Sequence, residues 1–387
     1  MPVQAEITSN IVPLARFRRH SATWLPSLTV ASLMIGLLLL PGCSGSDSSS
    51  TPASGEPGSS ASKDTASATS DSDKLVKLKL RLNWFPEAEH GGYYAALVHG
   101  FFKAEGLDVE ILKGGPGVPV REEVGIKRVE FGISNADQIL IARAAEADIV
   151  GVFAPLQTSP RCIMVHKKSG IQDFDGLQNL TIALNENSSF GAFLKKHAPL
   201  KGCKFVPYKG SLARFVLEDD FAQQAYLFSE PFVASKNGSD PQNLMAADFG
   251  FNPYTSVLIV HRDTISDQPD IVRRFVAASR RGWEKYLSEP SETNKHIQEQ
   301  NPEMEQDILA FGAAELRPLC KTSGDTPLGS MTRKRWSEIS EMLVDLELIE
   351  AAQADVDAAF ENRFIESTSK IDQSGPEKAE SSSGESN

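Results

Sequence analysis

The clearest pattern in the chain lies between residues 77 and 112. Apolar and polar side chains alternate from Lys77 to Asn83, which is typical of a half-buried β-strand. An aromatic and polar stretch follows, and a helix that begins at Gly91 and Gly92 then leads to a second strand at 107–112. This order predicts a βαβ unit with a ligand at the strand ends, because glycines at a helix start let a ligand approach backbone N–H groups closely.

The alternation of strands and helices continues along the chain and starts again near residue 180. Further strands are predicted at 129–134, 149–154, 180–184, 205–208, 224–228 and 254–261, and helices at 138–147, 190–197, 211–217, 269–287, 302–316 and 332–348. The restart predicts an α/β fold of two doubly wound lobes, with the second lobe inserted into the first. We place lobe 1 at 74–165 and 258–365 and lobe 2 at 166–257, so that two crossings near Val165 and Leu258 form a hinge beside a cleft.

The first 43 residues have the composition of a targeting segment. Three arginines precede a nearly continuous apolar run at 28–40, which is shorter than the roughly 20 residues needed to span a bilayer. The run closes in Leu-Pro-Gly-Cys, which resembles a bacterial lipobox, in which lipid is attached to Cys43 and the chain is cut just before it. Residues 44–73 and 366–387 offer almost no apolar side chains to bury, so we predict a flexible tether and a disordered tail.

Charge and cysteine content exclude several classes of function. The formal net charge of −12 argues against a nucleic-acid partner, because a phosphate backbone would be repelled. Besides Cys43, the chain contains Cys162, Cys203 and Cys320, an odd number that leaves at least one thiol free after lipidation. Their spacing matches no zinc site, and we expect no metal and no cofactor.

Five segments in order resemble the NMT1/THI5-like substrate-binding proteins of ABC transporters, which belong to the type II periplasmic binding protein superfamily. The segments are LRLNWFPEAEHGGYYAALVHGFFKAEGLDVEI, VEFGISNADQILIARAAEADIVGV, SGIQDFDGLQNLTIAL, QQAYLFSEPFV and PDIVRRFVAASRRGWEKYLSEPSE. The resemblance implies a monomeric solute receptor outside the cytoplasmic membrane, held there by its lipid, that hands a small heterocyclic or anionic nutrient to an ABC permease and its ATPase. Relatives of this kind recognise thiamine-pyrimidine precursors, riboflavin, sulfonates or nitrate.

One branch of the same family is enzymatic. The fungal pyrimidine synthase uses a lysine-bound pyridoxal phosphate as substrate, together with a histidine and a cysteine-rich iron-binding motif. In this chain Ser134 stands where the resemblance places the lysine, Gln138 stands where it places the histidine, and ADFGFNP contains no cysteine. The resemblance therefore implies a binding protein, with a synthase-like enzyme as the alternative.

Candidate ligand contacts in the first lobe begin at the end of its first strand. Trp84 and Phe85 could stack on a planar ligand, which would contribute about 1 kcal/mol beyond the burial of surface, although packing within the lobe is the competing interpretation. His90 could donate to a ligand carbonyl or phosphate, or could instead cap the helix or face solvent. Tyr93 and Tyr94 are adjacent in a helix and point apart, and we choose Tyr93 as the one that faces the cleft.

The remaining candidates lie at strand ends and helix starts. Ser134, Asn135 and Asp137 end the third strand, and Asn185, Ser188 and Ser189 form the matching helix start in the second lobe. Short polar side chains there could bind an anion or a carbonyl group, or simply cap the helices. Glu230 directly follows an apolar strand and could accept from ring N–H or amino groups of a heterocycle, with a hinge or interlobe salt bridge as the alternative. Tyr254 could line the hinge side of the cleft.

Overall fold

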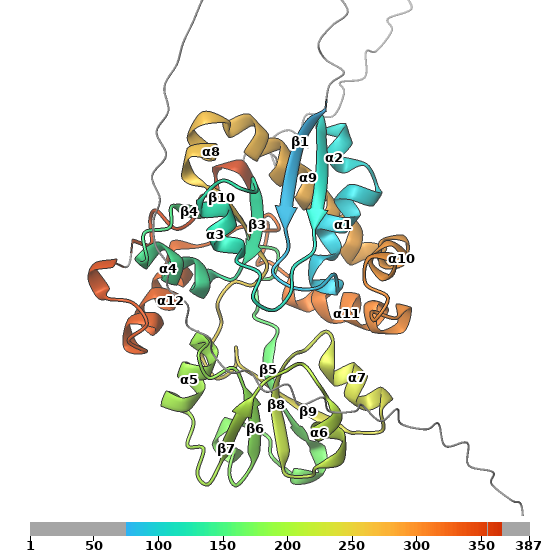
Figure 1. Cartoon of the computed structure of the whole chain (residues 1–387), viewed down its shortest axis with the longest axis vertical. Coiled ribbons are helices and arrows are strands. Elements are labelled where there is room, and N and C mark those ends of the chain that lie inside the picture. Colours follow the sequence, from blue (N-terminus) through green and yellow to red (C-terminus); the bar gives the residue numbers. More distant parts are fainter. Residues whose placement is uncertain (1–74, 354, 366–387) are drawn as a thin grey trace, which may run out of the picture. The chain divides into compact units, whose positions relative to one another are not determined.

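The computed structural model describes residues 75–353 and 355–365. The expected signal peptide with Cys43, the tether at 44–73 and the tail at 366–387 lie outside these residues. Within the described part of the chain the strands form two five-stranded sheets, and helices pack around each of them (Figure 1). No helix in these two ranges is both long enough and apolar enough to cross a membrane.

The first sheet has the strand order β2-β1-β3-β10-β4 and forms the centre of lobe 1. Its strands are β1 (Val76–Arg81), β2 (Leu107–Leu112), β3 (Phe131–Ser134), β4 (Ile149–Phe153) and β10 (Val257–His261). Strand β1 runs parallel to β2 and β3, and β10 runs antiparallel to β3 and β4. The parallel pairs place the carboxyl ends of β1 and β3 at the same edge of the sheet, where candidate ligand residues follow them.

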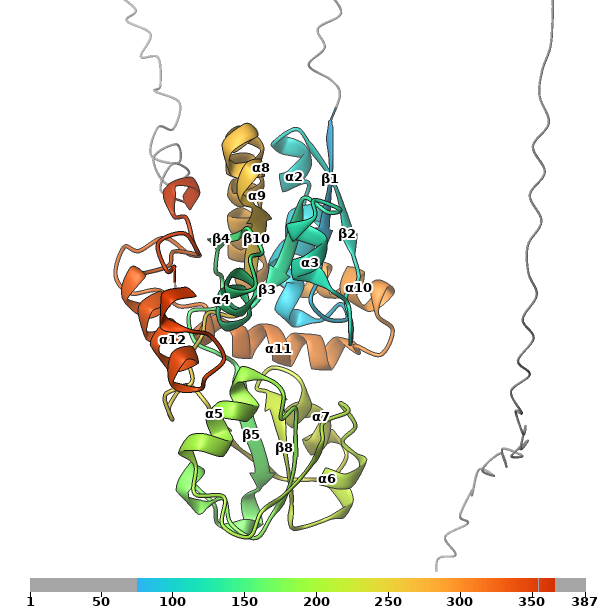
Figure 2. The same ribbon diagram turned by 60° about the vertical axis from the view of Figure 1, so that its left-hand side comes forward.

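Helices surround this sheet, and their buried side chains share its core with those of the strands. They are α1 (Gly91–Val98), α2 (Phe101–Ala104), α3 (Val120–Gly125), α4 (Ala136–Ala144), α8 (Arg262–Asp267), α9 (Pro269–Ser288), α10 (Ser291–Gln300), α11 (Gln306–Leu319) and α12 (Arg333–Asp345), with the 3₁₀ turns η2 (Ala88–His90) and η5 (Ala351–Gln353). Figure 2 shows α9 running alongside the sheet and α11 lying below it.

The two glycines at the start of α1 serve helix packing rather than ligand approach. A Cβ atom added at Gly91 would lie 2.0 Å from the ring of Tyr286, and one added at Gly92 would lie 2.1 Å from the ring of Trp283. Both rings belong to α9 and are fully buried, so the glycines let α1 and α9 approach each other closely. The expectation that these glycines admit a ligand is therefore wrong.

The second sheet has the order β7-β6-β8-β5-β9 and forms the centre of lobe 2. Its strands are β5 (Arg161–His166), β6 (Thr181–Leu184), β7 (Lys204–Pro207), β8 (Phe221–Tyr226) and β9 (Pro241–Met245), and its helices are α5 (Ser189–His197), α6 (Ala213–Leu217) and α7 (Glu230–Lys236), with the 3₁₀ turns η3 (Lys167–Ser169) and η4 (Phe174–Gly176). In this sheet β6 is parallel to β7 and β8, whereas β5 is antiparallel to β8 and β9. Each lobe therefore repeats one arrangement, in which the strand that follows the crossing inserts antiparallel beside the third parallel strand. This is the two-lobed type II periplasmic-binding-protein fold.

The chain passes between the lobes twice, once at residues 154–160 and once at residues 246–256. The second passage ends at β10, close to the expected crossing near Leu258. The first passage lies earlier than expected, because β5 pairs with β8 and β9 and so belongs to lobe 2. The apolar run of β5 fits either sheet equally well, so the sequence alone does not show which lobe it joins.

Candidate functional site

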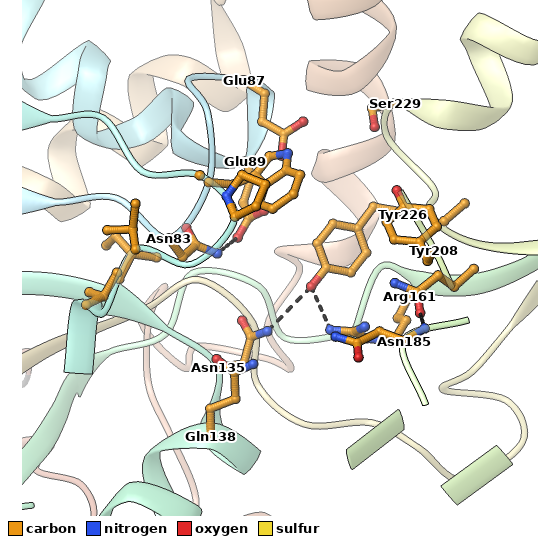
Figure 3. Close-up of a pocket in the computed structure, with 18 of the residues that line it drawn as sticks. Asn83, Glu87, Glu89, Asn135, Gln138, Arg161, Asn185, Tyr208, Tyr226 and Ser229 are labelled. Carbon is orange, nitrogen blue, oxygen red and sulfur yellow. Dashed lines mark hydrogen bonds between the residues drawn. The ribbon is translucent and has the colours of Figure 1, made fainter. Parts of the chain in front are cut away.

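A cavity of about 680 Å³ lies between the residues that end strands in both sheets (Figure 3). Its volume falls within the roughly 300–1,000 Å³ typical of small-molecule sites. The side chains that line it are mostly amides, carboxylates, aromatic rings and cations: Asn83, Trp84, Glu87, Glu89, Val118, Val120, Arg121, Ile133, Asn135, Gln138, Arg161, Asn185, Tyr208, Lys209, Gln224, Ala225, Tyr226, Ser229 and Glu230, with Gly115, Pro116 and Gly117 completing the wall.

Glu230 is held firmly on the lobe 2 side of the cavity. Its Oε1 accepts from the Tyr208 hydroxyl at 2.5 Å, and its Oε2 accepts from the Ser229 hydroxyl at 2.6 Å and from the Tyr226 N–H at 3.0 Å. Glu230 is also the first residue of α7, where the helix dipole favours a negative charge. A carboxylate in this setting is preorganised to receive a further donor from a ligand.

Glu87 and Glu89 bring two more carboxyl groups to the same cavity from lobe 1. Oε1 of Glu89 accepts from Ser256 Oγ at 2.6 Å and from Asn83 Nδ2 at 2.9 Å, whereas its buried Oε2 has no hydrogen-bond partner among the described residues. Burial raises the pKa of Glu89, and burial together with the charges of Glu89 and Glu230 raises the pKa of Glu87 well above its usual range. This side of the cavity therefore favours protons or positive charge.

Tyr226 joins the two lobes at the middle of the cavity. Its hydroxyl oxygen accepts from Arg161 Nη2 at 2.9 Å and from Asn135 Nδ2 of lobe 1 at 3.4 Å, as the dashed lines of Figure 3 show. The guanidinium of Arg161 also lies 5.1 Å from the centre of the Tyr226 ring. Burial raises the pKa of Tyr226 to about 12, so the hydroxyl stays protonated and can donate a hydrogen bond to a ligand.

A second contact between the lobes lies beside the cavity. The Ser189 hydroxyl, at the start of α5, donates to Oδ2 of Asp137 in the first turn of α4, and both side chains are buried. Ser188, one residue earlier, caps α5 by accepting from the N–H of Gly191 at 3.0 Å. Asp137, Ser188 and Ser189 thus act in lobe contact and helix capping, and none of them lines the cavity.

Four of the residues expected to contact a ligand line the cavity: Trp84, Asn135, Asn185 and Glu230. Each follows the carboxyl end of a strand, as the βαβ reasoning predicts. Asn185 also donates its backbone N–H to Oε1 of Gln224 at 2.8 Å, which fixes the loop after β6. Their role as ligand contacts stays a prediction.

The other lobe 1 candidates lie outside the cavity wall. Phe85 is 47% exposed and packs edge-on against Trp84, and Tyr93 is buried against Trp283, with its hydroxyl donating to the carbonyl of Ser256. Tyr93 points into the core because α9 covers the face of α1 that we expected to meet the cleft.

His90, Ser134 and Tyr254 also face protein rather than the cavity. His90 is fully buried with its Nε2 2.8 Å from Oδ1 of Asn83, so it positions a residue of the wall. Ser134 is buried, and its hydroxyl has no hydrogen-bond partner within residues 75–353 and 355–365. The Tyr254 ring lies beneath the guanidinium of Arg335, and its hydroxyl accepts from the N–H of Thr332 at 3.0 Å.

Several residues of the wall were missed by the sequence reasoning, and each has a reason in the topology. Arg161 opens β5, and because β5 is antiparallel to β8, Arg161 pairs with Tyr226 at the edge where β8 ends. A rule restricted to carboxyl ends of strands overlooks a residue at an amino end. Tyr208 and Tyr226 do stand at the ends of β7 and β8, and that position was the available signal.

The described residues offer no arrangement of three or more His, Cys, Asp or Glu side chains suited to a metal ion. Cys162, Cys203 and Cys320 are free thiols. Cys162 and Cys320 are buried, and burial raises the pKa of both above the usual range, so these thiols remain neutral and unreactive at neutral pH.

The sequence profile described as NMT1/THI5 like matches residues 87–293, which is more than half of the chain. A curated relative, the riboflavin-binding protein RibY of Chloroflexus aurantiacus, is 24% identical over 369 residues, covering 87% of this chain and 97% of RibY. A 4-amino-5-hydroxymethyl-2-methylpyrimidine phosphate synthase of Saccharomyces cerevisiae is 26% identical over 253 residues, covering 60% of this chain and 73% of the synthase.

Solved structures with the same fold are also found. The periplasmic aliphatic sulphonate binding protein SsuA from Escherichia coli superimposes with a TM-score of 0.59 at 14% identity, covering 73% of this chain and 91% of SsuA. At this level of identity the likeness establishes the fold alone.

Proposed function

The chain belongs to the NMT1/THI5-like family, and from this premise we propose that it is an extracytoplasmic solute-binding protein of an ABC importer. Its ligand is a small planar heterocycle, which the two lobes enclose and pass unaltered to a permease and its ATPase. The name of RibY, which matches over most of both chains, supports a binding role.

The cavity between the lobes is the single observation that carries this proposal. It draws its wall from both sheets, and within residues 75–353 and 355–365 two passages of the chain join the lobes, which is the architecture of hinge closure around a ligand. Trp84, Tyr208 and Tyr226 offer aromatic rings, and amide side chains such as Asn83 and Asn135 supply both donors and acceptors. A nitrogen-containing ring uses both kinds of contact.

An enzymatic role is the second candidate, because a pyrimidine phosphate synthase is among the relatives. The residues at positions 134 and 138 argue against an enzymatic role. Ser134 offers no amine to pyridoxal phosphate. Gln138 has no titrating side chain, and its amide oxygen accepts from Arg121 Nη1 at 2.8 Å.

A ligand panel tests the proposal. The purified chain is mixed with riboflavin, 4-amino-5-hydroxymethyl-2-methylpyrimidine, an alkanesulfonate, nitrate or pyridoxal phosphate, and binding is followed by thermal shift and calorimetry. We expect stoichiometric binding of a ring compound, and loss of that binding in Tyr226→Phe combined with Glu230→Gln. The matched control is Tyr94→Phe combined with Glu315→Gln, two residues outside the cavity wall. Failure of every ring compound to bind, or a covalent adduct with pyridoxal phosphate, would overturn the proposal.

We further propose that the protein is anchored through lipid on Cys43. Fractionation of cells tests this anchor independently of the ligand. The native chain should sediment with membranes and carry an N-terminal lipid by mass spectrometry, whereas Cys43→Ala should be released in soluble form. Recovery of unlipidated native protein in the soluble fraction would contradict the anchor.

A further inference from the structure

The side chain of Arg335 reaches both of the passages that join the lobes. Its Nη1 donates to the carbonyl oxygen of Gln157 in the first passage. In the second passage its Nε and Nη2 donate to the carbonyl oxygen of Asn252 at 2.9 and 2.7 Å, and Nη2 also donates to Asn252 Oδ1 at 2.7 Å. The Cζ atom of the guanidinium lies 4.1 Å from the centre of the Tyr254 ring. One side chain therefore contacts the hinge at both of its connections.

Asn252 lies at the point where the second passage leaves lobe 2. Phe251, just before it, is buried in the core of lobe 2, and Tyr254, two residues after it, is buried in the core of lobe 1. Asn252 Oδ1 also accepts from the N–H of Ser159 at 2.8 Å, which connects the two passages to each other. A rotation of lobe 2 relative to lobe 1 must therefore change the backbone at Asn252.

Arg335 itself is fixed to lobe 1. It lies near the start of α12, and the next residue, Trp336, is fully buried in the core of lobe 1. Gln157 belongs to the same lobe, because its N–H donates to the carbonyl oxygen of Leu319, the last residue of α11, at 2.8 Å. When the lobes turn, the guanidinium and Gln157 stay together, whereas Asn252 moves relative to both.

The far end of α12 contacts lobe 2. Its last residue, Asp345, has carboxylate oxygens 2.8 Å from Lys196 Nζ and 3.2 Å from His197 Nε2, both in the last turn of α5. Met342 packs against the cores of both lobes. The polar contacts are half exposed and contribute little alone, whereas those of Arg335 are charge-assisted and partly buried. The stronger constraint on the hinge is therefore the contact of Arg335 with Asn252.

We propose that Arg335 is a positioning residue of the hinge, which holds the ligand-free lobes in the closed arrangement of this structure. In this arrangement Tyr226 and Ser189 form hydrogen bonds to the opposite lobe. Opening draws the Asn252 carbonyl away from two guanidinium nitrogens and leaves partly buried donors unpaired, which costs free energy. Ligand enters during openings that break these bonds. The inference rests on the proposed function for ligand entry alone, because closure of the ligand-free chain can be measured without a ligand.

X-ray scattering of the ligand-free full-length chain tests the inference through the radius of gyration. Arg335→Lys keeps the positive charge but loses the fork of donors that reaches both passages. The ratio of open to closed molecules should rise about tenfold or more, and the radius should increase. Arg333→Lys is the matched control, because Arg333 lies on the same helix, is exposed and pairs with Asp357 at the surface. This control should keep the native radius.

A second pair of variants tests the same contact from the other side. Asn252→Ala removes the oxygen that accepts from Arg335 Nη2 and from the N–H of Ser159, so the radius should again increase. Asn252→Asp keeps an acceptor at that position and should retain the native radius. If Arg335→Lys does not fold, this pair decides the question. A larger radius for Asn252→Ala than for Asn252→Asp supports the inference, and equal radii overturn it.

Thermal unfolding separates the hinge contact from a contribution to stability alone. A lower unfolding midpoint of Arg335→Lys at the native radius would assign Arg335 a purely structural role and overturn the inference. Binding of a ring compound by the native chain, together with native radii in all variants, would refute the role of Arg335 and leave the proposed function intact. Increased radii in a chain that binds no ring compound would overturn the proposed function and leave the hinge contact intact.

Discussion

His90 offers a sharp test of the electrostatics beneath the cavity wall. Its ring is fully buried, and its Nε2 lies 2.8 Å from Oδ1 of Asn83. The other end of that amide is fixed, because Asn83 Nδ2 donates to Glu89 at 2.9 Å, so Oδ1 is an acceptor and His90 Nε2 must carry the hydrogen. Nδ1 is buried, and no residue in the described part of the chain offers an acceptor to a proton placed there.

Burial accordingly lowers the pKa of His90 from 6.5 to about 3. The folded protein keeps His90 neutral while the unfolded chain takes up a proton, so stability is lost as pH falls from about 6.5 toward 3. Each pKa unit corresponds to about 1.36 kcal/mol. Between roughly pH 7 and pH 5 only the upper part of the interval between the two pKa values is crossed, so the unfolding free energy should fall by about 2 kcal/mol.

The carboxyl groups nearby act in the opposite direction. The pKa values of Glu87 and Glu89 are raised by burial, so the folded protein binds their protons more firmly than the unfolded chain and gains stability as pH falls. The pH dependence of the native protein alone therefore mixes both effects. A comparison with His90→Gln isolates the histidine, because glutamine keeps a donor for Asn83 and does not titrate.

Urea unfolding followed by circular dichroism at pH 7, 6 and 5 measures the difference. Between pH 7 and pH 5 the native protein should lose about 2 kcal/mol more than His90→Gln, each protein being compared with its own value at pH 7. His296→Gln, a partly exposed histidine on α10, serves as the control and should follow the native protein. Equal pH dependence of the native protein and His90→Gln would refute the argument.

Four further substitutions test the site, the contact between the lobes, a helix cap and the helix packing. Trp84→Ala should raise the Kd for the ring ligand at least tenfold, about 1.4 kcal/mol, and an unchanged Kd in calorimetry would remove Trp84 from the site. Ser189→Ala removes the hydrogen bond to Asp137 that holds the lobes together, which is worth about 1.5–3 kcal/mol, so the radius of gyration of the ligand-free protein should increase in X-ray scattering. Ser188→Ala removes only a helix cap, so it should lower the unfolding free energy by about 1 kcal/mol and leave the radius unchanged. Gly92→Ala should lower the free energy of unfolding in urea by about 1–3 kcal/mol, because the added methyl group would collide with Trp283. A variant as stable as the native protein would contradict the close packing.

The sequence pattern predicts the architecture well because strands and helices have different periods. It places β1, β2, β3 and β10 correctly, and the restart near residue 180 corresponds to β6 of the second lobe. It misassigns β5 and misses β9 at Pro241–Met245, where Pro, Gln and Asn interrupt the apolar alternation. An edge strand with such residues is defined by its partner, which the local sequence does not contain.

The site is predictable where the chain turns directly after a strand. Trp84, Asn135 and Asn185 follow this rule and line the cavity. Tyr93 does not, because the face that α1 presents to the cleft is decided by α9, almost two hundred residues later in the chain. Arg161 was hidden by the antiparallel direction of its strand, a property of the sheet rather than of the sequence around it.

Native mass spectrometry of the gently purified protein tests the central claim most directly, when the bound species is weighed in the complex and again after release by acid. The account predicts one small ring compound per chain, with the same mass in the complex and after release. A covalent adduct, a converted product, or a protein that binds no ring compound at saturating concentration would contradict it.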